Sequence, residues 1–424
     1  MTHTLLEQFR EYAVSRGIAG GAYIVGGAVR DMLLGKKPVK DVDIILEEDA
    51  RAVAVHFADT SGATFVALDE ELGNYRIVKK GEFLDLSVMR YKSLSLDLSE
   101  RDLSINAMAL PLISAQELED ALIDPFHGAG DLRRGLLRMV SAENFIKDPL
   151  RLLRVYRFMT TLGFAVEKDT ERALVELSSL ITSVSAERIA EELRLIIVSG
   201  SSYHVIKAMA ASGILFLILP ELECGNTDEA LDIYRLVEEM INSPLLYFGE
   251  EGKAMSSYFS QDFRKTGAKL SSLFSSGETL VASALRLKMS RRETDYMTLL
   301  VDHRECVSML GRHREDFSAL ESIRLLKNIR DDLYPLLLYA LASRLCPDPG
   351  SSLYREVLAF YDGVLKDRID FLPLITGEDL IREFHLAPSP LFGTILEAVE
   401  DNALAGSIAS RQEALAFVKK AFGL

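Results

Sequence analysis

The stretch Tyr23-Ile-Val-Gly-Gly-Ala-Val-Arg-Asp31, followed ten residues later by Asp41-Val-Asp43, decides how the first part of this chain is expected to fold. Its apolar run predicts a strand that ends at Gly26 and Gly27, where a turn leads into a helix. Asp41 and Asp43 lie two positions apart in a second apolar run, so in a strand both carboxylates face one side. Two carboxylates beside a glycine turn suit a divalent cation such as Mg²⁺ and a triphosphate. The spacing therefore predicts a two-metal phosphoryl-transfer site.

The periodicity of apolar residues changes along the chain. The expected strands are 22–26, 41–46, 63–68, 74–79 and 82–88, and the expected helices beside them are 4–16 and 51–60. Residues 103–112 are expected to turn helical, and 122–140 to form a loop with a short apolar close. From Ser141 onward we expect no strands, and the apolar spacing predicts helices, first at 144–163, 168–178 and 186–198. The fold class is therefore an α+β head with a mixed β-sheet, followed by an all-α remainder.

Composition is typical of a water-soluble globular protein of several domains. The chain has 424 residues, a mean hydropathy of +0.12 and three scattered cysteines, and it lacks an apolar run long enough for a membrane span. Without a signal-peptide pattern at its start, we expect it in the cytoplasm. The net charge of −15 does not exclude RNA binding, because a local basic face suffices. Seven cations lie close together in the sequence, namely Arg133, Arg134, Arg138, Lys147, Arg151, Arg154 and Arg157.

Gly26-Gly-Ala-Val-Arg-Asp31 with Asp41-Val-Asp43 resembles the signature of the class II tRNA nucleotidyltransferase (CCA-adding enzyme) and bacterial poly(A) polymerase family. The resemblance runs from about residue 20 to about residue 200. It implies a nucleotidyltransferase head at 1–140, a base-reading neck at 141–200, a helical body at 201–310 and a tRNA-binding tail at 311–424. It also implies Mg²⁺ as cofactor, CTP and ATP as substrates, and the tRNA 3′ end as the acceptor.

The head carries further candidate site residues. Asp85 is an acid inside an apolar strand, and in the family a carboxylate on this strand completes the catalytic site with Asp41 and Asp43. Arg30 follows the glycine turn and is suited to bind phosphate oxygens through two hydrogen bonds. Glu100-Arg-Asp-Leu-Ser-Ile-Asn-Ala107 resembles the Arg-Arg-Asp-Phe-Thr-Ile-Asn-Ala pattern, with Glu100 in place of the first arginine. By this resemblance Arg101 and Asp102 lie near the ribose, and Asn106 lies near the metal or the phosphates.

The neck is expected to read the nucleobase. In Lys147-Asp-Pro-Leu-Arg-Leu-Leu-Arg-Val-Tyr-Arg157 the polar residues Asp148, Arg151 and Arg154 share a broad helix face. In the family the Asp and the first Arg select cytosine or adenine through their Watson–Crick edges, and Asp148 and Arg151 occupy those positions. Arg154 and Arg157 suit base stacking or phosphate contact. Lys147 departs from the pattern, because a glutamate is usual there. The turn Asp124-Pro-Phe-His-Gly-Ala-Gly-Asp-Leu132 is interpreted as a wall or hinge with His127 at the surface.

Several alternatives stay open on the sequence alone. About ten residues separate Arg90 from Arg101, and members of the family that add only the two cytidines tend to be short there. Leu72-Gly-Asn-Tyr-Arg-Ile-Val78 does not match the stretch usual in the poly(A) polymerase branch, which makes that alternative less favoured. The region 205–302 lacks histidine, so the body is interpreted as a degenerate HD-like domain. A non-catalytic RNA-binding module is the remaining alternative.

Overall fold

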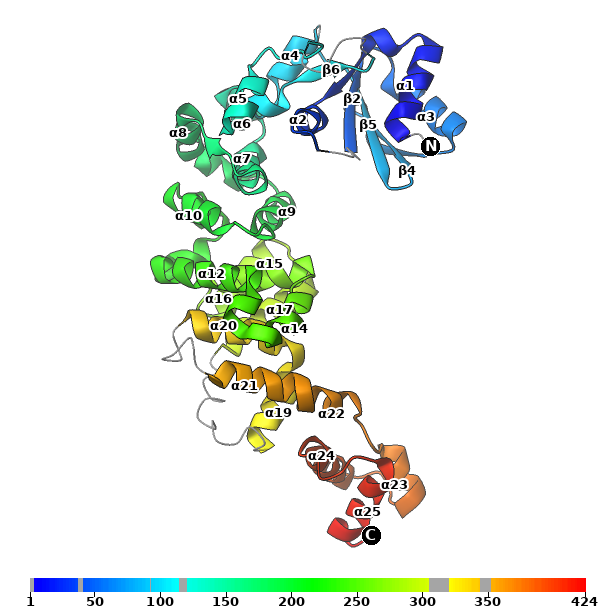
Figure 1. The fold of residues 1–424 in the computed structure, drawn as a ribbon, viewed down its shortest axis with the longest axis vertical. Helices are drawn as coiled ribbons and strands as arrows, with labels where there is room; N and C mark the ends of the chain where they lie inside the picture. The colour runs from blue at the N-terminus through cyan, green and yellow to red at the C-terminus, as the bar shows by residue number, and fades with distance from the viewer. Residues whose placement is uncertain (1–3, 37–40, 92, 114–119, 305–319, 344–351) are drawn as a thin grey trace. The chain divides into compact units, whose positions relative to one another are not determined.

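The computed structural model describes residues 4–36, 41–91, 93–113, 120–304, 320–343 and 352–424 of the chain. The chain forms two compact units. Unit 1 comprises Met1–Ile196 and Ala208–Ile218, and unit 2 comprises Ile197–Lys207 and Leu219–Leu424. Unit 1 contains the sheet of the head, which is blue and cyan in Figure 1. The finer division into head, neck, body and tail stays a prediction.

The head is built on a mixed sheet of six strands, five of which the sequence predicts. The strands are β1 (Ala22–Val25), β2 (Asp41–Leu46), β3 (Thr64–Asp69), β4 (Asn74–Lys79), β5 (Glu82–Val88) and β6 (Ala109–Pro111). Their order is β3-β4-β5-β2-β1-β6, and β2 and β5 run parallel while the other neighbours are antiparallel. The parallel pair matters for the site because it aligns Asp43 with Asp85.

Alternation along β2 separates the core from the carboxylates. Val42 and Ile44 point into the main core of the head, which includes Phe9 of α1 (Leu5–Arg16) and Phe57 of α3 (Ala50–Ser61). Asp41 and Asp43 alternate with them and therefore face the opposite side of the sheet. Each of the two helices has a defined start, because Thr4 forms a capping box with Glu7 and Asp49 accepts hydrogen bonds from the first turn of α3.

The predicted helical turn at 103–112 is wrong. Ser104–Asn106 forms a short 3₁₀ turn, and β6 then adds an edge strand beside β1. Nearly every side chain from Leu103 to Leu112 is buried, so the run shows no polar face from which its period could be read. Pro111 is compatible with a strand here because β6 lies at the edge of the sheet.

The predicted loop at 122–140 contains a helix, α5 (Gly128–Arg134), and a short strand, β7 (Leu136–Leu137). The Asp124 carboxylate starts the helix by accepting hydrogen bonds from the amides of Gly128 (2.7 Å) and Ala129 (2.9 Å). Gly128 is required at this point, since a Cβ there would lie 2.1 Å from the carbonyl oxygen of Ser104. His127 is exposed, as expected, with a φ of 59°.

The neck region of unit 1 is helical apart from one short strand. The expected helix at 144–163 is interrupted, because Pro149 separates α6 (Ala142–Lys147) from α7 (Leu150–Leu162). β8 (Ala165–Val166) pairs with β7, so the expectation of no strands after Ser141 is wrong. The remaining helices of the neck are α8 (Lys168–Glu176) and α9 (Ala186–Ile197). Unit 1 also contains α11 (Ile214–Ile218), and α2 (Gly27–Leu33) and α4 (Leu94–Ser99) belong to the head. α10 (Tyr203–Ala211) contributes residues to both units.

Unit 2 is helical throughout its described residues. Its helices are α12 (Thr227–Asn242), α13 (Pro244–Phe248), α14 (Gly252–Tyr258), α15 (Asp262–Ser271), α16 (Gly277–Arg286), α17 (Arg291–Asp302), α19 (Leu320–Ile329), α20 (Leu333–Ala342), α21 (Ser352–Phe360), α22 (Lys366–Asp370), α23 (Gly377–Phe384), α24 (Leu391–Leu404) and α25 (Arg411–Phe422). The apolar helix α20 lies in the larger core, and α23, α24 and α25 pack around a second core.

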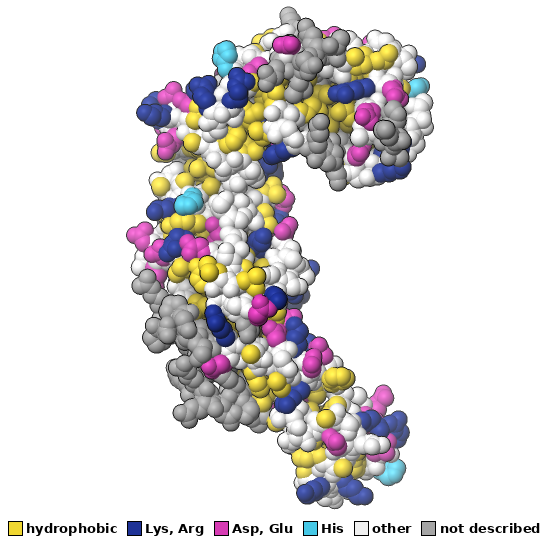
Figure 2. Space-filling model, viewed as in Figure 1, with side chains coloured by type: hydrophobic (Ala, Val, Ile, Leu, Met, Phe, Trp, Pro, Cys, Tyr) yellow, Lys and Arg dark blue, Asp and Glu magenta, His cyan; other side chains and the backbone are white. Residues whose placement is uncertain are grey.

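Charged side chains of both signs are interspersed on the face drawn in Figure 2. Six of the seven clustered cations have hydrogen-bond or ion-pair partners, and several partners are acids distant in sequence, such as Glu100, Asp102, Glu167 and Glu192. No helix among the described residues is long and apolar enough to cross a bilayer.

Candidate active site

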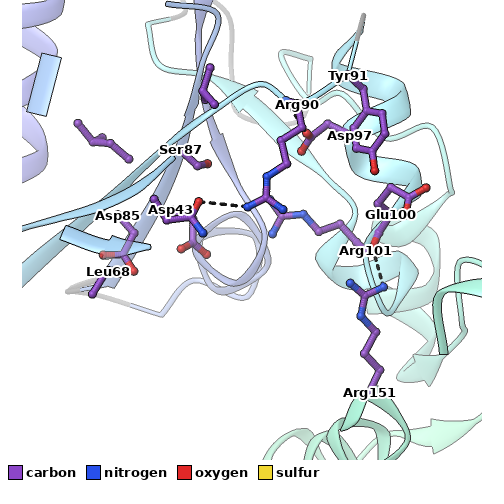
Figure 3. A pocket seen from close by; sticks show the side chains of 13 residues that line it. Asp43, Leu68, Asp85, Ser87, Arg90, Tyr91, Asp97, Glu100, Arg101 and Arg151 are labelled. Atoms are coloured by element: carbon purple, nitrogen blue, oxygen red, sulfur yellow. Dashed lines mark hydrogen bonds between the residues drawn. The ribbon is translucent and has the colours of Figure 1, made fainter. Parts of the chain in front are cut away.

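A pocket of about 390 Å³ lies within unit 1 between the sheet and the first turns of the neck. Its volume is in the range of small-molecule sites. Figure 3 shows Asp43 and Asp85 on one side and Arg90, Arg101 and Arg151 on the other, where Asp97 and Glu100 also lie. The residues that line it are Asp43, Leu68, Asn74, Asp85, Leu86, Ser87, Val88, Arg90, Tyr91, Asp97, Glu100, Arg101 and Arg151.

The acidic side of the pocket comes from neighbouring strands. Asp41 and Asp43 lie on β2, and Asp85 lies opposite Asp43 on β5. Burial raises the pKa of Asp43, and the charges of Asp85 and Asp41 raise it further, while the charge of Arg101 acts in the opposite direction. The Asp41 side chain is 68% exposed, so its carboxylate is accessible from solvent. The prediction that Asp41, Asp43 and Asp85 lie on neighbouring strands is therefore confirmed.

Gly26 lets the chain pass close to these carboxylates. It has a φ of 69°, and a Cβ at this position would lie 3.3 Å from both Asp43 Oδ2 and Arg101 Nη1. A side chain would therefore be strained by its backbone and would press on two residues of the pocket. Gly27 starts α2, and the side chain of Arg30 on this helix lies 3.4 Å from where a Cβ of Gly27 would stand.

Arg76 of β4 was missed by the sequence reasoning. Its Nε and Nη2 donate to the two oxygens of Asp85, each at 2.7 Å, and its Nη2 lies 3.9 Å from Asp41 Oδ1. Arg76 and Asp85 are directly opposite in the antiparallel β4–β5 pair. An arginine inside an apolar strand next to an acid-bearing strand was the available signal. Asp85 is consequently half of a close ion pair with Arg76.

The donor set fits a divalent cation held by few protein ligands. Among the described residues, no three His, Cys, Asp or Glu side chains form a ready-made metal cage. Mg²⁺ usually takes one or two carboxylates and completes its octahedron with water and substrate phosphates. Asp41 and Asp43 are compatible with that mode, because they project from one strand face and the ionised form of Asp43 is disfavoured without a further positive charge.

Asp102 lies in a buried network rather than open to the pocket. It is 4% exposed and accepts hydrogen bonds from Arg154 Nε (2.7 Å), Asn106 Nδ2 (3.0 Å) and the amide of Leu103 (2.8 Å). Burial alone would raise the pKa of Asp102, but the charge of Arg154 and these hydrogen bonds hold it below its ordinary value. Asn106 Oδ1 in turn accepts from Arg30 Nη1 at 2.8 Å. Four predicted residues thus form one connected network.

Arg151 and Asp148 of the neck lie close to each other at the start of α7. Arg151 lines the pocket, and its Nη1 donates to the carbonyl oxygen of Glu100 at 2.7 Å. Asp148 ends α6, lies 3.8 Å from Arg151, and accepts from Arg188 Nη2 of α9 at 3.1 and 3.3 Å. Arg188 lies in the helix expected at 186–198, but its contact with Asp148 was not expected.

Arg157 and Arg154 are held within unit 1. Arg157 Nε donates to Glu192 Oε2 at 2.8 Å, as Arg154 does to Asp102. Both guanidinium groups lie over the ring of buried Phe158, at 4.6 and 5.7 Å from its centroid. Neither residue is among those that line the pocket. Direct contact of either with a nucleotide stays a prediction.

Comparison with known proteins agrees with this architecture. Residues 22–138 match the family described as "Poly A polymerase head domain", and 163–225 match "Probable RNA and SrmB- binding site of polymerase A". A CC-adding tRNA nucleotidyltransferase of Synechocystis is 33% identical over 405 residues, covering 94% of this chain and 93% of the relative. An A-adding tRNA nucleotidyltransferase of Halalkalibacterium halodurans is 29% identical, covering 100% of this chain and 95% of the relative.

Solved structures show the same fold. The Thermotoga maritima CCA-adding enzyme complexed with tRNA has a TM-score of 0.71 at 24% identity, covering 99% of this chain and 95% of that one. A CCA-adding enzyme in complex with ATP has a TM-score of 0.74, also at 24% identity and with 99% and 95% coverage. The Synechocystis relative, 33% identical over 94% of this chain, shows that the chain belongs to the tRNA nucleotidyltransferase and poly(A) polymerase family. The α+β head followed by a mostly helical remainder is confirmed.

Proposed function

We propose that this protein is a tRNA nucleotidyltransferase that adds the two cytidines of the CCA terminus to the tRNA 3′ end. The observation that carries the proposal is one pocket with Asp43 and Asp85 on one side and Arg101 and Arg151 on the other. Acidic residues that suit a divalent cation and arginines that suit phosphates and a base are the groups that nucleotidyl transfer requires.

Similarity favours cytidine addition over adenosine addition. A CC-adding tRNA nucleotidyltransferase of H. halodurans is 40% identical over 176 residues, covering 41% of this chain and 43% of the relative. The A-adding relative from the same organism is 29% identical, although over a longer alignment. The short segment between Arg90 and Arg101 supports the same choice, and most of it is used by α4. The curated relatives named here are tRNA enzymes, which supports a tRNA acceptor over general polyadenylation.

The residues that line the pocket and those beside it have complementary roles in this proposal. Asp41 and Asp43 would hold Mg²⁺, with Asp85 kept in place by Arg76. When bound, the cation supplies activation of the RNA 3′-hydroxyl and neutralisation of the leaving pyrophosphate. Arg101, together with Arg30, binds and orients the triphosphate through charge-assisted hydrogen bonds.

Selection of the base requires no nucleic-acid template in this proposal. Asp148 supplies an acceptor and Arg151 supplies donors to the Watson–Crick edge of cytosine. Asp102, Asn106, Arg154 and Arg157 keep the nucleotide-binding wall rigid from behind. We assign triphosphate binding to residues 1–140, base reading to 141–200 and tRNA contact to the body at 201–310 and the tail at 311–424. We assign the protein to the cytoplasm, where tRNA is processed.

The proposal is tested by reading RNA 3′ ends after incubation with CTP and ATP, separately and together. The acceptors are a tRNA ending before CCA, a tRNA ending before the terminal A, and an unrelated RNA. We expect two cytidines on the first acceptor and no extension of the other two. Long adenosine tails on any RNA would identify a poly(A) polymerase. Binding of tRNA without any incorporation would identify an RNA-binding module.

A further inference from the structure

Two positions at which this chain departs from the pattern of its family lie in direct contact. Lys147 Nζ donates to Glu100 Oε1 at 3.0 Å and to Oε2 at 2.9 Å. The family pattern has an arginine at position 100 and a glutamate at position 147, so both charges are reversed in this chain. The hydrogen bond from Lys147 to the Glu100 carboxylate also raises the pKa of the lysine. The two departures therefore compensate each other electrostatically.

The pair joins the two segments that are assigned to the nucleotide. Glu100 caps the end of α4 and directly precedes Arg101, which lines the pocket. Lys147 is the last residue of α6 and directly precedes Asp148. Figure 3 shows Glu100 next to Arg101, with Arg151 reaching toward the same turn. The contact thus spans 47 residues of sequence and links triphosphate binding to base reading.

Other contacts between these segments do not depend on the side chain at position 100. Asn144 Nδ2 donates to the carbonyl oxygens of Ser99 (2.7 Å) and Arg101 (2.8 Å), and Arg151 Nη1 donates to that of Glu100 (2.7 Å). Because the acceptors are backbone atoms, these bonds fix the turn for any residue there. The Lys147–Glu100 contact, by contrast, needs opposite charges on both side chains.

We propose that Glu100 and Lys147 are a charge-reversed positioning pair that sets the placement of Arg101 relative to Asp148 and Arg151, and with it the preference for CTP. This inference rests on the proposed function. The Lys147 side chain is 48% exposed, so the pair contributes little to overall stability. Misplacement of a substrate-orienting group by a fraction of an ångström lowers the rate far more than it lowers stability.

The test is a charge-reversal cycle with Lys147→Glu, Glu100→Arg and the double variant. In Lys147→Glu two carboxylates would face each other, and we expect kcat/KM for CTP on tRNA lacking CCA to fall about three- to tenfold. We also expect the ratio of CTP to ATP incorporation to fall. Adding Glu100→Arg restores the opposite charges, so the double variant should return to within about twofold of the unaltered protein.

A matched control is the exposed pair formed by Arg51 and Glu70, whose atoms lie 3.9 Å apart away from the residues that line the pocket. Arg51→Glu reverses one charge in the same unit and should leave both readouts unchanged. Thermal unfolding midpoints should be alike for all variants. A double variant no better than Lys147→Glu alone, or an unchanged CTP preference in Lys147→Glu, overturns the pairing. If the unaltered protein incorporates no nucleotide, the proposed function itself fails, which is a separate outcome.

Discussion

Two aspartates near the pocket, Asp43 and Asp102, have pKa values that are shifted in opposite directions. On the sheet side, burial and neighbouring acids raise the pKa of Asp43, and the charge of Arg101 offsets this only in part. Behind the opposite wall of the pocket, Asp102 is even more deeply buried, yet Arg154 of the neck and two further donors keep its pKa below the ordinary value. Asp43 is half-buried and Asp102 is buried, so burial alone would raise both pKa values, and the difference lies in the partners that the fold supplies.

This difference indicates which carboxylate has its charge compensated by the protein and which one requires a bound cation. The network around Asp102 has its cation and its hydrogen bonds, so it can hold the wall of the pocket rigid before a nucleotide binds. Asp43 carries a charge that the protein compensates incompletely, as expected for a residue whose counterion is a bound cation. The predictions below test this contrast, in order of decreasing effect.

The largest effect should follow removal of a carboxylate that we propose to bind the metal. In Asp43→Asn the acceptor for the cation is lost while the shape of the side chain is kept, so nucleotide addition to tRNA should fall at least about a hundredfold. Gel analysis of single-nucleotide addition measures this, and filter binding should show tRNA affinity unchanged. Incorporation at the normal rate would refute the assignment of Asp43 as a ligand.

Loss of Asp102 should lower stability rather than act on the metal. Asp102→Ala leaves Arg154 and Asn106 without their acceptor inside the protein, so the free energy of unfolding should fall by about 2–3 kcal/mol. Urea denaturation measures the change. The matched control is Asp169→Ala, which removes a 65% exposed partner of Arg172 and should change stability little.

The pH dependence of that effect has a defined sign. Because the pKa of Asp102 is lowered on folding, its contribution is fully present above the unfolded pKa of about 3.9. It is lost as the pH falls through the lower folded pKa. The stability difference between the unaltered protein and Asp102→Ala should therefore stay constant from pH 7 to pH 5 and shrink only in stronger acid. A difference that already vanishes at pH 5 would contradict the account.

An intermediate effect is expected on base choice. Asp148→Ala removes an acceptor near Arg151 and leaves Arg188 without its carboxylate, so the preference for CTP over ATP should fall about tenfold. Competition between the two labelled nucleotides measures this ratio. Glu176→Ala, at an exposed site at the end of α8, serves as the control and should keep the preference.

The smallest effect is a gain in stability from an inactivating change. Because the pKa of Asp43 is raised on folding, its ionised form opposes folding at pH 7. Asp43→Asn should therefore raise the unfolding midpoint of the metal-free protein by about 2 °C. The gain should shrink as the pH falls below the raised pKa of Asp43 and vanish below its ordinary pKa of about 3.9. Calorimetry would contradict the account if the variant were less stable at pH 7.

The sequence predicted five of the six strands of the sheet, because those strands have strong local signals. Asp41 and Asp43 alternate with buried Val42 and Ile44, so their common face could be read directly. The turn before β6 could not be read, because the buried run from Leu103 to Leu112 has no polar face. The start of α5 was missed because its cap, Asp124, acts from outside the helix.

Long-range partners were the main omission at the site. Arg154 and Arg157 were expected to contact a base or a phosphate of the nucleotide. In the structure Arg154 and Arg157 pair with Asp102 and Glu192, which lie 52 and 35 residues away. Likewise Arg76 meets Asp85 across two strands. Such pairs depend on strand register and helix packing, which a local pattern of charges does not specify.

Titration of the nucleotide-free protein with Mn²⁺ in place of Mg²⁺ tests the central contrast most directly. The free ion is followed by its electron paramagnetic resonance signal, at high protein concentration. We predict that the unaltered protein and Asp148→Ala bind Mn²⁺ with equal affinity, because the carboxylate of Asp148 is already paired with Arg188 and does not bind the metal. Asp43→Asn should bind it at least about tenfold more weakly. Equal binding by Asp43→Asn and the unaltered protein would contradict the account.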